Sequence, residues 1–193
     1  MGEIKSALEI ALEKTKSVAG DKRAVEADRA RKEGKQLVSR FFDDPSFNLE
    51  GSLKSYDADR VEWMKEGIRQ VLMANLALPA DQLAMKKIRR VGEGFKALSR
   101  KPKQVQGLFS QLESFFAEYI EEKERMREAL VNQYTPRLKQ KEQELSQKMG
   151  SPVRIDIDSD PEFSALLRKY MGQLEEKYQS VLDQAKEQLT EIV

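Results

Sequence analysis

Apolar side chains recur every three or four residues along most of this chain, and this spacing predicts helices. The first predicted helix covers Glu3 to Phe42 and ends before Pro45, because the residue before a proline disfavours helical dihedral angles. Residues 21–35 carry almost only charged side chains and alanine, so we expect a solvated connecting helix or a partly frayed one there. The apolar stripe predicted near the N-terminus consists of Ile4, Leu8, Ala11, Leu12, Thr15 and Val18.

Two further helices are predicted in the middle of the chain. The first covers residues 57–76, with Asp57 as its N-cap, and the second begins at Pro79 and ends near Ser99. Residues 46–56 are predicted to be irregular or to form a small hairpin, because Phe47 and Leu49 alternate with polar residues before a glycine-containing turn. The apolar stripe of the second helix consists of Ala84, Ile88, Val91, Phe95 and Leu98.

The last half of the chain predicts two long helices. The longer one covers residues 104–149 with a heptad-like apolar seam, and Pro136 inside it is expected to kink or break it. Val153, Ile155 and Ile157 then alternate with charged residues, which predicts a short strand-like tip over 153–157. The last helix opens at Pro161, and its predicted buried stripe consists of Phe163, Leu167, Tyr170, Leu174, Tyr178, Val181, Ala185, Leu189 and Ile192.

These elements predict a mainly α, elongated helical protein with a long antiparallel C-terminal helical hairpin, a small helical bundle and at most one minor β element. Three regions are expected. Residues 1–42 form an N-terminal amphipathic and charged helix, 43–103 a small helical unit with a basic helix, and 104–193 the hairpin. At 1.5 Å per residue, the hairpin is expected to be roughly 45–60 Å long.

Composition narrows the chemistry that this fold can carry. The 193 residues include 34 Lys or Arg and 33 Asp or Glu, and no Cys or His. The charged fraction of 35% suits long exposed helices. Without thiol or imidazole groups there is no cysteine nucleophile, no histidine base and no zinc site of the usual kinds. We therefore expect no enzymatic activity and no cofactor. No uncharged stretch is long enough for a transmembrane segment, and a cytoplasmic location is expected.

The even charge total hides an uneven distribution. Residues 77–107 carry eight basic and two acidic residues, whereas residues 150–193 carry five basic and nine acidic ones. At 100° per residue, the cations of the second middle helix lie opposite its apolar stripe, which indicates a basic amphipathic helix. The candidate basic interaction face consists of Lys86, Arg89, Arg90, Lys96 and Arg100. Such a face can follow nucleic-acid phosphates, lie on anionic lipid, meet an acidic protein surface, or be neutralised within the fold.

A second candidate is the acidic interaction patch Asp156, Asp158 and Asp160. The spacing is similar to that of a calcium-binding loop, but such a loop needs Gly at its sixth position and Glu at its twelfth, and Pro161 and Leu167 stand there. No metal site is therefore assigned to it.

The leading functional hypothesis is a non-catalytic interaction or scaffold protein that presents coiled-coil-like helical surfaces for self-association or for protein partners. The layout of long charged helices is similar to that of stalk, tether and coiled-coil adaptor proteins. The alternative is a nucleic-acid-binding accessory protein that uses the basic helix 86–103, although the near-neutral charge disfavours a nucleic-acid partner. A third hypothesis is an enzyme that uses carboxylates and a divalent ion near Asp156 to Asp160.

Overall fold

The computed structural model describes the backbone of residues 7–193 and the side chains of residues 22–193. Over that range the chain forms six α-helices, one short 3-10 helix and no β-strand, which confirms a mainly α fold. It divides into two compact units. The N-terminal unit runs to Leu76 and also includes Arg90–Val105 and Val193, and the hairpin unit comprises Ala77–Arg89 and Gln106–Ile192.

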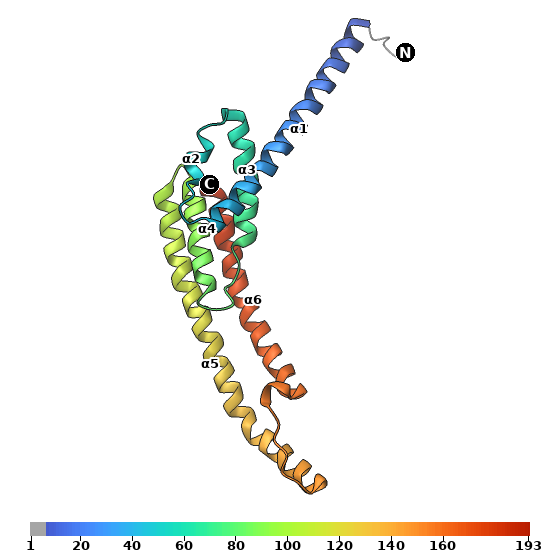
Figure 1. The fold of residues 1–193 in the computed structure, drawn as a ribbon, viewed down its shortest axis with the longest axis vertical. Coiled ribbons are helices and arrows are strands. Elements are labelled where there is room, and N and C mark those ends of the chain that lie inside the picture. Colours follow the sequence, from blue (N-terminus) through green and yellow to red (C-terminus); the bar gives the residue numbers. More distant parts are fainter. Residues whose placement is uncertain (1–6) are drawn as a thin grey trace. The chain divides into compact units, whose positions relative to one another are not determined.

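Figure 1 shows the helices in their order along the chain. They are α1 (Ala7–Asp43), α2 (Leu49–Leu53), α3 (Ala58–Asn75), α4 (Ala84–Leu98), α5 (Pro102–Met149), the 3-10 helix η1 (Ile157–Ser159) and α6 (Pro161–Ile192). In the described part of the chain, no helix combines the length and the apolar character needed to cross a lipid bilayer.

The closest helix contact in the N-terminal unit joins α1 and α3, which run side by side in the same direction (Figure 1). Ala27, Ala30 and Gly34 of α1 are buried there. A methyl group added to Gly34 would collide with the carbonyl oxygen of Met64, and one added to Gly67 would collide with that of Arg31. The two backbones therefore touch, and only glycine leaves room for this approach.

This contact corrects the expectation for residues 21–35. The segment is neither a solvated connector nor frayed, because its small residues pack against α3 while its charged side chains form ion pairs around the contact. Arg31 Nε lies 2.6 Å from Glu66 Oε2, and Arg60 lies 2.7 Å from Glu33 Oε1. The α1 backbone is helical through Gly20. The predicted stripe in residues 4–18 lies outside the residues whose side chains are described.

Two local predictions in the N-terminal half are wrong at residue level. Residues 49–53 form the short helix α2 and no hairpin, because the Asn48 side chain accepts a hydrogen bond from the Gly51 N–H at 2.8 Å and caps the helix. The helix expected from Pro79 begins only at Ala84, whose N–H is capped by Asp81 Oδ1 at 3.0 Å. Of the predicted stripe, Ile88, Val91, Phe95 and Leu98 are buried as expected, whereas Ala84 is only partly buried.

In the hairpin unit, α5 continues through Pro136 as one gently curved helix, so the expected break does not occur (Figure 1). Gly150, at φ 68°, ends α5 in the left-handed conformation that glycine adopts readily. Two predicted core positions of α6 are wrong, because Tyr170 and Val181 are 39% and 44% exposed. Leu167 and Ile192 are only partly buried, and the fully buried Leu182 was not predicted.

The strand-like tip expected over 153–157 is not a strand. Val153, Ile155 and Ile157 are partly buried, and Arg154 and Asp156 between them are exposed, so buried and exposed residues do alternate as predicted. The partner, however, is a helix. The N–H of Val153 donates to Ser146 Oγ and that of Ile155 to Glu142 Oε1, each at 2.8 Å. Side chains of α5 thus take the place of a neighbouring strand.

The α1–α3 contact yields a stability prediction. Gly67→Ala should lower the free energy of unfolding by about 1–3 kcal/mol or more, because its methyl group meets a backbone atom that cannot move aside. Gly107→Ala in α5 is the matched control. Apart from the backbone of its own helix turn and its two neighbours in the chain, nothing lies within 4 Å of its added methyl group, so the change should stabilise the helix by about 0.5–1 kcal/mol. Urea denaturation measures both values, and equal effects at the two positions would contradict the contact.

Candidate interaction surfaces

The hairpin unit is built on antiparallel packing of α5 against α6 (Figure 1). Near the C-terminal part of α6, the Tyr178 ring lies 4.8 Å from that of Phe115 and 4.9 Å from that of Tyr119, measured between centroids. The Tyr178 hydroxyl donates to Glu122 Oε2. Burial, together with this hydrogen bond, raises the pKa of Tyr178 above its usual range.

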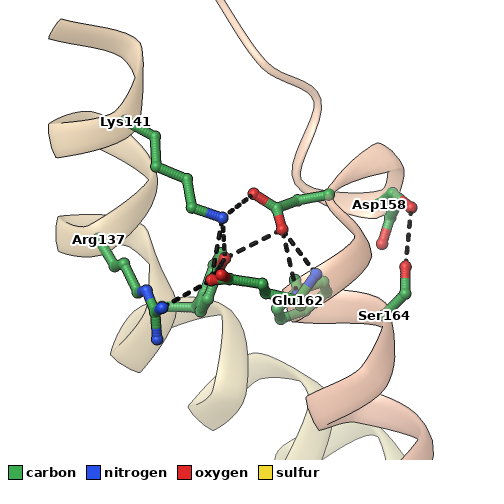
Figure 2. Close-up of polar contacts among 8 residues, drawn as sticks. Arg137, Lys141, Asp158, Glu162 and Ser164 are labelled. Atoms are coloured by element: carbon green, nitrogen blue, oxygen red, sulfur yellow. Dashed lines mark hydrogen bonds and ion pairs between the residues drawn. The ribbon is translucent and has the colours of Figure 1, made fainter. Parts of the chain in front are cut away.

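Where α6 begins, Asp160 forms the centre of a polar cluster with α5. Figure 2 shows this cluster, with Lys141 and Glu162 labelled. The Asp160 side chain is almost fully buried and accepts hydrogen bonds from the N–H groups of Glu162 and Phe163, at 2.8 and 3.4 Å. From α5, Lys141 Nζ lies 2.8 Å from one carboxylate oxygen and the Tyr134 hydroxyl lies 3.0 Å from the other. Asp160 therefore caps α6 and binds α5 with the same carboxylate.

Proton affinities in this cluster favour the charged ion pair. The hydrogen bond from Lys141 lowers the pKa of Asp160 to about 2, and hydrogen bonds to Asp160, Tyr134 and Glu162 raise the pKa of Lys141. Glu162, which lies 3.0 Å from Lys141 Nζ, has a lowered pKa for the same reason. A lysine nucleophile or base needs the opposite shift. The cluster is thus suited to holding two helices together.

The three residues of the predicted acidic patch point to different partners. The Asp156 side chain caps η1 by accepting a hydrogen bond from the Asp158 N–H, and Asp158 accepts two from Arg127 at 2.6 and 2.8 Å. Asp160 is buried in its cluster. Within residues 22–193, no group of three or more acidic side chains is placed to hold a metal ion.

Beside the Asp160 cluster lies an apolar cluster that is only half covered. Four of its residues are buried, and these are Leu130, Tyr134, Leu138 and Phe163. Six more pack against them while remaining partly exposed, and these are Met126, Val131, Ile155, Ile157, Leu166 and Leu167. One turn beyond Leu166 on α6, Tyr170 is 39% exposed. We call these eleven residues the open apolar cluster. Two helices and one connecting segment cannot enclose it.

The N-terminal unit carries an open groove of about 1190 Å³ between the end of α1, α2, the start of α3 and the second half of α4. Apolar residues form its floor, namely Phe41, Phe47, Leu49, Leu53, Val61, Ala97 and Leu98. Its charged lining consists of Lys54, Lys65, Arg90, Lys96 and Arg100 together with Glu50, Glu62 and Glu93. We call this surface the basic groove.

The structure divides the predicted basic face between the two units. Arg90, Lys96 and Arg100 line the basic groove. Lys86 and Arg89 belong to the hairpin unit, where Arg89 Nε lies 2.9 Å from Glu113 Oε2. The five cations thus do not form one continuous binding face within a single unit.

Arg90 has a structural role that the sequence did not reveal. Its guanidinium donates to the carbonyl oxygens of Phe41 and Asp44, each at 2.9 Å, and so satisfies acceptors at the C-terminal end of α1. It also stacks over the Phe41 ring, 3.6 Å from the centroid, and lies 2.7 Å from Glu93 Oε2. Arg90 therefore joins α4 to α1.

Sequence reasoning also missed Lys141 and Tyr134. Pro161 predicted the correct start of α6, but Asp160 was assigned to an acidic patch and not to a lock with α5. Its partners stand 19 and 26 residues earlier in the chain. They lie in a charge-mixed helix where many lysines look alike, so no local signal marks them.

Taken together, the fold and its surfaces define an all-α protein with a buried polar lock between two long helices, an open apolar cluster and a basic groove. The chain belongs to a family of unknown function, DUF6657, whose model matches residues 50–191. It matches no curated protein and no solved structure.

The Asp160 cluster predicts a pH-dependent contribution to stability. Asp160→Asn should lower the melting temperature at pH 7 by several degrees, because Lys141 loses its buried counter-charge. Folding lowers the pKa of Asp160, so its stabilisation is complete above the unfolded-state value of about 3.9 and is lost as pH falls through about 2. In thermal melts, the difference in melting temperature between Asp160→Asn and wild type should therefore shrink as the pH falls from about 3.9 to about 2.

Asp158→Asn is the control for this experiment, since it removes an exposed ion pair that contributes little at any pH. A difference between Asp160→Asn and wild type that stays constant down to pH 2 would contradict the assigned ion pair.

Arg90 predicts a second stability effect. Arg90→Lys keeps the charge but cannot reach two carbonyl oxygens and stack on Phe41 at once, so it should cost about 1–3 kcal/mol of unfolding free energy. Lys86→Ala, an exposed position on the same helix, should change it by less than about 0.5 kcal/mol. Chemical denaturation measures both free energies of unfolding. An Arg90→Lys variant with the wild-type value would contradict the role of Arg90 in joining α4 to α1.

Proposed function

We propose that this protein is a non-catalytic interaction protein that associates with a second copy of itself through the open apolar cluster of the α5–α6 hairpin. The observation that carries the proposal is the low coverage of that cluster. Of its eleven residues, four are buried, six are partly exposed and Tyr170 is 39% exposed. Exposed apolar patches of this kind, edged by charged residues, are typical of protein–protein contacts.

A second hairpin is a suitable cover because helical hairpins pack in pairs as four-helix bundles. Such an arrangement buries the apolar side chains of both copies at once, with one set of contacts repeated by two-fold symmetry. Leu166 and Tyr170 are spaced by one helical turn on α6 and present the cluster's exposed edge. They therefore should contribute most to the contact.

The non-catalytic part of the proposal rests on the chain's own chemistry. There is no His or Cys, and the most strongly perturbed lysine is held in its charged form by Asp160. The exposed carboxylates of the hairpin tip are bound to Arg127 or to backbone N–H groups. The proposal therefore assigns these groups to holding the interaction surface in shape.

Multi-angle light scattering over a range of protein concentrations tests the self-association. Wild type should shift from monomer to dimer, and the shift should persist at high salt because the contact is apolar. The double variant Leu166→Gln/Tyr170→Gln should weaken dimerisation by about tenfold or more, since two apolar side chains no longer gain from burial.

Leu83→Gln is the matched control, because Leu83 is also apolar and 71% exposed in the hairpin unit but lies outside the open apolar cluster. It should dimerise like wild type. A wild-type protein that stays monomeric at every concentration, or an equal loss in both variants, would refute the proposed contact.

A further inference from the structure

Two exposed apolar side chains lie near the end of α5, beyond the open apolar cluster. Leu145 is 39% exposed and Met149 is 67% exposed. They stand 11 residues after Tyr134 and Leu138, respectively. Eleven residues are close to three full helical turns, so the two side chains lie on the side of α5 that carries these buried residues. The apolar face of α5 therefore continues to the end of the helix, and we call Leu145 and Met149 the apolar tip.

The other elements of the hairpin unit leave the apolar tip exposed. Lys141 of α5 binds Asp160, which directly precedes α6, so α5 continues past the start of α6 for about two turns (Figure 1). The segment that follows α5 turns back along it, but it donates its backbone hydrogen bonds to Glu142 and Ser146 on a neighbouring side of the helix. The last turns of α5 thus lack the helix that covers the same face farther up.

A matching exposed side chain lies in the opposite direction along the hairpin. Val181 is 44% exposed and stands 11 residues after Tyr170, so both side chains lie on one edge of α6. The hairpin unit, whose residues are all described, exposes five large apolar side chains, and these are Leu83, Leu145, Met149, Tyr170 and Val181. All except Leu83 therefore belong to α5 or α6.

The alignment of α5 with α6 is fixed by the hydrogen bonds at Asp160 and at Tyr178. Between these bonds the residues of the two antiparallel helices face each other in reverse order. Leu166 therefore lies about level with Tyr134, and the residues one turn farther along each helix are also level. These two levels mark the centre of the open apolar cluster.

The apolar tip and Val181 lie at equal distances from this centre. Leu145 is 11 residues from Tyr134 in one direction, and Val181 is 11 residues from Tyr170 in the other. Each separation corresponds to about 16 Å along a helix. A two-fold axis through the centre, perpendicular to the helices, would therefore place Leu145 of each copy level with Val181 of the other.

Charge favours this antiparallel arrangement over a parallel one. The cluster divides the hairpin unit into a tip half, residues 131–170, and a far half, residues 77–89, 106–130 and 171–192. The tip half has seven basic and six acidic residues, a net charge of +1, and the far half has eight basic and twelve acidic residues, a net charge of −4. A parallel pair would place two negative far halves side by side, whereas an antiparallel pair places each far half beside a tip half.

We propose that the two hairpins of a dimer pair antiparallel, so that the apolar tip of each copy packs on Val181 of the other. The inference rests on the proposed self-association and adds the orientation of the second copy and a contact at each end of the interface. It covers all four of the exposed apolar side chains on α5 and α6 in one interface, with Tyr170 at the centre and the tip contacts at both ends.

Single cysteines test the orientation, because the chain has no Cys of its own. The variants are Leu145→Cys and Val181→Cys, each treated with a short bismaleimide that joins two thiols. Neither variant alone should give a covalent dimer, because equivalent residues of the two copies lie about 40 Å apart in the antiparallel pair. An equimolar mixture of the two should give one, visible in a denaturing gel.

The matched control is Gln143→Cys, which stands two residues before Leu145 on the opposite, exposed side of α5. Mixed with Val181→Cys, it should give no more covalent dimer than either variant alone. Met149→Cys is the second tip variant, in case Leu145→Cys weakens the dimer, and it should also cross-link to Val181→Cys.

Light scattering on the same samples separates this inference from the proposed function. Dimers whose mixed tip and Val181 variants do not cross-link, or cross-link no better than the Gln143→Cys mixture, would overturn the tip contact and leave the hairpin dimer standing. Covalent dimers from Leu145→Cys alone would indicate a parallel pair and overturn the antiparallel one. A wild-type protein that is monomeric at every concentration would refute both the inference and the proposed function.

Discussion

The hairpin unit depends on one buried carboxylate. Asp160 accepts hydrogen bonds from the first N–H groups of α6 and at the same time binds Lys141 and Tyr134, so the start of α6 is fixed to the C-terminal third of α5. A long two-helix hairpin has little core to resist sliding of one helix along the other. A polar lock has defined geometry, so it sets the register that apolar side chains alone would leave loose. The open apolar cluster keeps its shape because of this register.

Strong helical periodicity explains why most of the fold could be predicted from the sequence. The ends of α1, α3, α5 and α6 agree with the expected boundaries within about three residues, except for the N-terminal start of α1, which lies partly outside the described range. The failures have two causes. Charge and alanine content hid the packed face of residues 21–35, because glycine and alanine contribute little hydrophobicity but allow backbones to touch. The period of two at 153–157 correctly gave the buried side, but a pattern does not say whether the neighbour is a strand or a helix.

The candidate surfaces were less predictable than the helices. The sequence identified the cations of α4 and the acids near α6, yet it treated each group as one face. Arg90 instead joins α4 to α1, and Asp160 is buried in a lock. Whether a charged residue is exposed or bonded within the fold depends on residues tens of positions away, and a single sequence carries no signal for such pairs. The sequence indicated the open apolar cluster only indirectly, because the predicted helices carry more apolar side chains than two packed helices can bury.

The glycine contact between α1 and α3 has a consequence for how this family can vary. The family match begins at residue 50, so it includes Gly67 but not the α1 backbone that touches it. A glycine on one helix allows the two backbones to approach closely only if the opposing helix also has a small residue at the point of contact. We expect that relatives which keep a glycine at the Gly67 position also keep a small residue opposite it, even where the rest of their first helix has diverged. Two small residues that carry no functional group would then be coupled across the contact between the first and the third helix.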